Sequence, residues 1–116
     1  MINRLIPVFT RSEIAAVKED EIVYAENQGR LVTIYTTSRK YSYYGKLSDL
    51  KEMLGHSFCS CHSSMIINFE KVASIKDGTF RMEGGQILPM GKNSYHSARK
   101  SFIDFVKNHN AQAENG

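Results

Sequence analysis

The chain has 116 residues and a mass of 13.2 kDa, a size typical of one domain. Its hydrophobic fraction of 41% and charged fraction of 23% exclude wholesale disorder, and its two cysteines exclude a dense disulfide scaffold. The net charge of +3 permits a polyanionic partner without requiring one. No apolar run is long enough for a membrane span or a secretory signal, so we expect a cytoplasmic protein with no membrane partner.

Alternating side chains dominate the first half of the chain. Residues 21–26 and 31–36 are short runs rich in β-branched and aromatic side chains, which predicts two strands. Gly29 between them can adopt the positive φ that a three-residue hairpin loop needs. After a turn at 37–38, residues 39–44 predict a third strand that completes a meander.

The second half continues in the same style. Two hairpin signals, Asp77-Gly78 and Gly84-Gly85, lie on either side of a run in which Phe80 and Met82 point to one face. Pro89 ends the last run at a sheet edge or strand end. The predicted strands are residues 64–69, 72–76, 79–83 and 86–88.

Two segments have helical spacing. Leucines at i, i+3 and i+7 predict a two-turn helix between residues 45 and 55. Apolar side chains near the C-terminus follow helical spacing from a candidate N-cap at Ser94. The sequence therefore predicts a mainly β fold with one short internal helix and a C-terminal helix. We expect one domain over residues 1–109 and a flexible polar tail over 110–116.

The cluster Cys59-Ser60-Cys61-His62 is the clearest candidate for chemistry. A closed zinc site needs four ligands, and the chain has no second cysteine pair. On a strand, Cys59 and Cys61 would share one face and His62 the other, which also argues against a catalytic Cys–His pair. No phosphate-binding or dinucleotide-binding motif occurs. We therefore expect no catalytic residue, no metal, no cofactor and no small-molecule substrate.

Polar and basic side chains gather at three expected loop tips. Amide, guanidinium and ammonium groups can pair with base edges in a major groove, and hydroxyl and imidazole groups can contact phosphates or bases. Each loop alone is more typical of a solvated turn than of a contact site, so this pattern only leaves nucleic-acid binding open. The candidate DNA-binding residues are Asn27, Gln28, Arg30, His62, Ser63, Lys92 and Asn93.

Two other functions remain open at this point. Tyr41, Tyr43 and Tyr44, next to Arg39 and Lys40, could stack the bases of a single-stranded nucleic acid. The favoured interpretation is that Tyr41 and Tyr43 fill a sheet face, since tyrosine is common in strands. A protein-interaction module that pairs through a sheet edge or the terminal helix is the third class.

Four segments in a fixed order resemble a known family. The chain from about Ile14 to Phe105 resembles the LytTR DNA-binding domain. The segments that carry the resemblance are Glu21–Thr36, Tyr41-Ser42-Tyr43-Tyr44-Gly45-Lys46-Leu47, Phe58 followed by His62-Ser63-Ser64-Met65-Ile66-Ile67-Asn68, and Leu88-Pro89-Met90-Gly91-Lys92.

The resemblance implies an elongated arrangement of antiparallel sheets in which loops, not a recognition helix, enter DNA grooves. It also implies that the chain is the output half of a bacterial response regulator in a two-component system. The implied partner is double-stranded DNA with direct repeats in a promoter, and a second copy of the chain would bind the same duplex. By position, the contact loops fall at Asn27–Arg30, His62–Ser63 and Lys92–Asn93. Asn68 corresponds to a structural residue that holds a turn.

Some positions depart from the family pattern. Ser60 and Ser63 stand where the family often has an arginine, and Gly91 stands where it often has a serine. Lys92 replaces a frequent arginine and loses the bidentate fork for guanine. These changes predict weaker binding or a different sequence preference. The chain has no room for a receiver domain, and Met1 favours a stand-alone regulator over an excised output domain.

Overall fold

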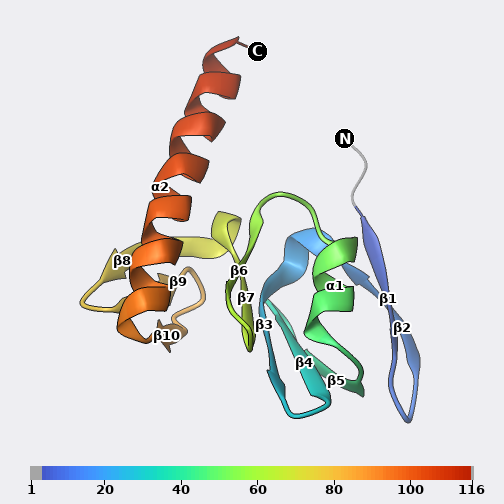
Figure 1. Ribbon diagram of the computed structural model, residues 1–116. Helices are drawn as coiled ribbons and strands as arrows, with labels where there is room; N and C mark the ends of the chain where they lie inside the picture. The colour runs from blue at the N-terminus through green and yellow to red at the C-terminus, as the bar shows by residue number, and fades with distance from the viewer. Residues whose placement is uncertain (1–3, 116) are drawn as a thin grey trace. The chain divides into compact units, whose positions relative to one another are not determined.

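The structure of the protein, a computed structural model, describes residues 4–115 and divides into two compact units at the Asn68–Phe69 boundary. Figure 1 shows β1–β7 and α1 in the first unit and β8–β10 and α2 in the second. The elements of the first unit are β1 (Leu5–Phe9), β2 (Ile14–Lys18), β3 (Ile22–Gln28), β4 (Leu31–Thr36), β5 (Lys40–Tyr44), α1 (Leu47–Met53), β6 (Phe58–His62) and β7 (Met65–Asn68), with a 3₁₀ turn at Glu19–Glu21.

A five-stranded antiparallel sheet forms the centre of the first unit. Its strand order is β5-β4-β3-β7-β6, and β1 and β2 form a separate two-stranded hairpin. The meander predicted from residues 21–44 is confirmed as β3, β4 and β5. The contact that the sequence did not reveal is between β3 and β7, in which Tyr24 pairs with Ile67 and Glu26 with Met65.

The core of the first unit lies on the face of this sheet that α1 covers. The apolar side chains of the predicted short helix, Leu47, Leu50 and Leu54, are all buried, which confirms its amphipathic pattern. The hairpin contributes the alternate residues Ile6, Val8 and Val17 to the same core. The sheet contributes Ile22, Ala25, Val32, Ile34, Phe58 and Ile66.

Two strand segments escaped the sequence analysis for identifiable reasons. The β1–β2 hairpin exposes Leu5, Phe9 and Ile14 on its outer face, so the sequence lacks the apolar–polar alternation that marks a half-buried strand. Strand β6 reads Phe-Cys-Ser-Cys-His and contains no β-branched residue, so local propensity gives it little signal.

The second unit packs a three-stranded sheet against one long helix. Its elements are a 3₁₀ turn (Phe69–Lys71), β8 (Val72–Lys76), β9 (Thr79–Met82), β10 (Ile87–Pro89) and α2 (Lys92–Asn115), and the sheet order is β10-β9-β8. Phe80 and Met82 are buried as their alternation predicted. Phe80 lies edge-on to Tyr95 and Phe102 of α2, with ring centroids 6.3 and 6.4 Å apart.

Helix α2 begins earlier than predicted. The Tyr95 amide donates a hydrogen bond to the Gly91 carbonyl at 2.9 Å, which places Lys92 inside the first turn. The predicted N-cap at Ser94 is therefore wrong, since Ser94 is itself helical. The helix extends through Asn115 and so covers most of the segment 110–116 that we expected as a tail. Within residues 4–115 no helix has the length and apolar character needed to cross a membrane.

Candidate nucleic-acid interface

The first candidate loop is the tight turn between β3 and β4. Gln28 pairs with Leu31, which leaves Gly29 and Arg30 as a two-residue turn in place of the expected three-residue loop. Gly29 has φ +60°, and no atom lies within 4 Å of where its Cβ would be. A positive φ at the first turn residue is the feature of a type II′ hairpin, which matches the twist of the strands. Gln28 and Arg30 are exposed, whereas Asn27 donates from Nδ2 to the Gly29 carbonyl at 3.2 Å.

The second candidate loop is the turn between β6 and β7. His62 pairs with Met65, and Ser63 and Ser64 form the turn between them. The Ser64 amide donates to Nδ1 of His62 at 3.1 Å. Because Nδ1 accepts this hydrogen bond, the proton of the neutral ring lies on Nε2, which is left as a donor.

These two turns adjoin at one end of the five-stranded sheet. The Asn27 amide, at the end of β3, donates to the Ser64 carbonyl at 3.1 Å. On the other side of the β3–β4 turn, the Gly45 amide donates to the Arg30 carbonyl at 2.9 Å. The structure thus brings together two of the three loops that the sequence singled out, and backbone hydrogen bonds hold both in register with the sheet.

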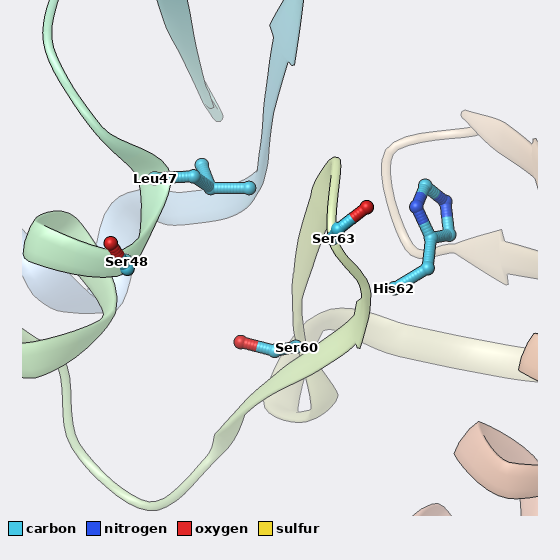
Figure 2. A pocket seen from close by; sticks show the side chains of 5 residues that line it. All are labelled: Leu47, Ser48, Ser60, His62 and Ser63. Carbon is cyan, nitrogen blue, oxygen red and sulfur yellow. The ribbon is translucent and has the colours of Figure 1, made fainter.

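A shallow pocket of about 470 Å³ lies beside the β6–β7 turn, between this turn and the start of α1 (Figure 2). Its lining residues are Leu47 and Ser48 from α1 and Ser60, His62 and Ser63 from β6 and its turn. In Figure 2 the Ser60 hydroxyl points toward α1, whereas the His62 ring lies on the far side of the strand. The pocket therefore offers hydroxyl groups, and Lys46 is exposed immediately before α1.

Sequence analysis missed Ser48 as a member of this site. Its position inside an amphipathic helix pattern is typical of a solvent-facing residue, and only the fold shows that it lies opposite Ser60. In the sequence, Ser60 belongs to the Cys59–His62 cluster and departs from the arginine that the family often has. No local signal in the sequence connects these two serines, because only the fold places them along the same pocket.

The third predicted loop has a different form from the one we expected. Lys92 and Asn93 are exposed residues in the first turn of α2, not tips of a loop. Lys92 thus lies in the helix turn whose free backbone amides favour anions. These residues belong to the second unit, whereas both turns described above belong to the first.

The tyrosines provide little surface for stacking bases. Tyr41 and Tyr43 pack against the core, as the favoured interpretation expected, and the Arg39 guanidinium lies 4.2 Å from the centroid of the Tyr41 ring. Tyr44 alone of these three is well exposed, at 71%. A single-strand platform needs successive exposed rings, so this arrangement does not favour that alternative.

On the opposite face of the sheet, Tyr24 and Tyr35 stack on each other with centroids 4.3 Å apart. The Tyr35 hydroxyl donates to the Glu26 carboxylate at 3.0 Å. Desolvation, together with the negative potential of Tyr35 and Glu26, raises the pKa of Tyr24 to about 12. The side chains of this cluster contact one another, and Glu26 adds a carboxylate that would repel phosphates. The cluster therefore suits structural support better than contact with DNA.

Asn68 has the structural role that the resemblance implied. Its side chain is 1% exposed, and Nδ2 donates to the Ile22 carbonyl at 2.8 Å. This hydrogen bond ties the end of β7 to the start of β3. The pairing of these strands sets the relative position of the two turns at the opposite end of the sheet.

The fold and these turns define a mainly β domain in which two adjoining hairpin turns present polar groups at one end of the central sheet. A family model described as the LytTr DNA-binding domain matches residues 12–102, which span both units. The chain therefore belongs to the LytTr DNA-binding domain family, the DNA-binding domain of transcriptional regulators.

Two similar proteins agree with this assignment. The transcriptional regulatory protein NatR of Bacillus subtilis (strain 168) is 32% identical over 72 residues, which are 61% of this chain and 31% of NatR. The chain thus spans about a third of the length of that relative. The solved LytTr DNA-binding domain of a protein described as a methyl-accepting/DNA response regulator from Bacillus cereus has the same fold, with a TM-score of 0.71 and 21% identity. That match covers 86% of this chain and 96% of the solved one.

Proposed function

We propose that this chain binds double-stranded DNA with sequence specificity and serves as the DNA-binding part of a transcriptional regulator. The observation that carries the proposal is the junction of two polar turns at one end of the sheet, with Arg30 and Ser63 exposed and Nε2 of His62 left as a donor. Arg30 is exposed and pairs with no carboxylate among residues 4–110, whose side chains the structure describes. The relative NatR is itself a transcriptional regulatory protein, which supports this function for the present chain.

The spacing of the turns suggests how they share the duplex. The two hairpins are neighbours in the order β4-β3-β7-β6, so their centres are about 10 Å apart at the usual strand spacing. A major groove about 12 Å wide admits one two-stranded ribbon. One turn therefore enters the groove, and the adjoining turn reaches the phosphates along its wall.

The side chains at these positions suit both kinds of contact. Arg30 can form a bidentate pair with guanine, and the Nε2 proton of His62 can be donated to an acceptor on a base edge or a phosphate. The hydroxyl groups of Ser48, Ser60 and Ser63, together with Lys46, suit a phosphate on the groove wall. Lys92 at the start of α2 supplies a further cation. We propose that the target consists of direct repeats occupied by two copies, as the family resemblance implies.

Alanine variants test which groups touch DNA. Arg30→Ala and Lys92→Ala should each weaken binding to cognate duplex by about 1–3 kcal/mol if they contact bases. A phosphate contact should instead lower binding equally for all sequences and reduce the salt dependence by about one counterion. Lys18→Ala and Lys107→Ala remove the same charge from exposed positions that are not among the proposed contacts, and they serve as matched controls.

The affinities of these variants distinguish binding through particular loop residues from binding through net positive charge. Losses confined to the Arg30 and Lys92 variants support the proposed contacts. Wild-type affinity in both variants would show that the loop assignment is wrong. Equal losses in all four variants would mean that only net charge matters.

A further inference from the structure

Strand β6 holds the only two cysteines of the chain, directly before the β6–β7 turn. Both are free thiols. Cys59 is half-buried, and Cys61 is 8% exposed. His62, a proposed DNA contact, directly follows Cys61 in the chain, so a change in the backbone at Cys61 also changes the position of His62.

A β-bulge brings the two thiols together. Ser60 pairs with Ile66 and His62 pairs with Met65, so Cys61 is an extra residue without a partner across the strands. In a regular strand, residues two apart have Cα atoms nearly 7 Å apart, at the upper limit for a disulfide. The bulge bends the strand, and Sγ of Cys61 lies 3.6 Å from the carbonyl oxygen of Cys59.

The two sulfur atoms also differ in acidity. The neighbouring thiol of Cys61, aided by the charge of Lys51, holds the pKa of Cys59 below its usual value. The neighbouring sulfur of Cys59, together with burial, raises the pKa of Cys61. Cys59 is therefore the more nucleophilic and more accessible thiol, and Cys61 is an adjacent protonated partner. This is the arrangement of an oxidisable cysteine with its resolving cysteine.

We propose that Cys59 and Cys61 form a dithiol oxidation site, and that closing their disulfide weakens DNA binding by displacing the β6–β7 turn. This regulatory step rests on the proposed function. A peroxide supplies the oxidising equivalents: the Cys59 thiolate attacks one peroxide oxygen, giving a sulfenic acid and releasing hydroxide, or water after protonation. The Cys61 thiol then attacks the sulfenic sulfur, the S–S bond forms, and a second water leaves.

The structure indicates why the disulfide should affect the turn. Oxidation removes the Cys61 S–H and with it the hydrogen bond to the Cys59 carbonyl, which helps to hold the bulge. The S–S bond requires a dihedral angle near 90°, which the present backbone must adjust to reach. Since His62 is the next residue and pairs with Met65, its ring and the Ser63–Ser64 turn move with the adjustment. Loss of one base contact of about 1–3 kcal/mol corresponds to roughly 5- to 150-fold weaker binding.

The test treats the full chain with hydrogen peroxide and follows both chemistry and DNA binding. Trypsin cleavage after Lys51 and Lys71 would place both cysteines in a peptide of which Glu52 is the first residue. We expect this peptide to lose two hydrogen atoms and to resist alkylation until a reductant is added. We expect the affinity for cognate duplex to fall at least tenfold and to recover on reduction.

Cysteine variants show whether an effect of peroxide comes from the disulfide or from oxidation of other side chains. Cys59→Ser and Cys61→Ala cannot close the disulfide but retain all five methionines, so a peroxide effect in these variants would come from elsewhere. Cys59→Ser changes the more exposed position, and its thermal unfolding curve checks that it folds. Peroxide-resistant DNA binding by this variant, with sensitive binding by the wild type, supports the proposal.

Three results would overturn the inference in distinguishable ways. Intermolecular disulfides or sulfinic acid in place of the internal bond would show that the thiols do not resolve each other. An internal disulfide with unchanged DNA affinity would remove the regulatory role. A reduced protein that binds no duplex at all would refute the proposed function itself, whatever the peptide mass shows.

Discussion

Replacing His62 with asparagine or glutamine separates the two nitrogen atoms of its ring. In the structure Nδ1 accepts the Ser64 amide hydrogen at 3.1 Å, and Nε2 is the proposed donor to DNA. Asparagine places its side-chain oxygen near the position of Nδ1 and can form the same bond to the amide two residues on. Glutamine is longer and places its amide near the position of Nε2 instead.

The expected effects of the two variants are opposite. His62→Asn should keep the turn hydrogen bond, and so change the free energy of unfolding little, but it should lose a DNA contact worth about 1–3 kcal/mol, or roughly 5- to 150-fold in affinity. His62→Gln should lose about 0.5–1.5 kcal/mol of stability with the turn hydrogen bond and keep more of the DNA affinity.

Thermal unfolding and fluorescence anisotropy with labelled duplex measure the two effects separately. His62→Ala, which removes both nitrogen atoms, serves as the reference for complete loss of both effects. The reasoning is refuted if His62→Asn binds duplex as tightly as the wild type while His62→Gln does not, because the contact atom would then be Nδ1. It is also refuted if all three variants bind normally.

Three further predictions concern the stability of the five-stranded sheet and of its β3–β4 turn. Asn68→Ala should cost about 1–3 kcal/mol in urea unfolding, because it leaves the buried Ile22 carbonyl without its 2.8 Å donor; a cost near zero would show that this bond is unimportant. Gly29→Ala should cost about 1 kcal/mol through its positive φ alone, since no atom crowds the site, whereas Gly29→Asn should cost less; equal costs would argue against backbone strain. The raised pKa of Tyr24, about 12 against an ordinary 10, means that its contribution to stability is complete below pH 10 and is lost as the pH rises toward 12. Unfolding followed across this range should show a smaller alkaline loss for Tyr24→Phe, and identical curves would contradict the assignment.

The local pattern of apolar and polar residues was sufficient to predict an element and its buried side chains wherever one face of that element is buried and the other is solvated. The leucine spacing of α1 and the alternation of Phe80 and Met82 identified the buried side chains of both elements. The pattern failed for the β1–β2 hairpin because Phe9 and Ile14 are apolar on the exposed face too. It also misplaced the start of α2, where Lys92 is helical although Ser94 is the better capping residue by type.

The sequence was sufficient to predict which residues form the candidate site, but not how the two turns lie next to each other in space. The glycine turn at Gly29 and the polar tip at His62 were visible in the sequence. Their adjacency depends on the pairing of Glu26 with Met65, a contact between segments far apart in the chain that no local pattern encodes. The proton position on the His62 ring depends in turn on the Ser64 amide, which only the folded turn brings to it.

The most direct test of the central claim is fluorescence anisotropy with a duplex from the promoter of the protein's own gene. A scrambled duplex and a single strand of the same length serve as competitors, each titrated at several salt concentrations. We predict tighter binding to the promoter duplex than to either competitor, with an affinity that falls linearly on a logarithmic salt scale as phosphate contacts release counterions. Equal weak binding to all three nucleic acids would contradict sequence-specific recognition by the turns and leave only a basic surface.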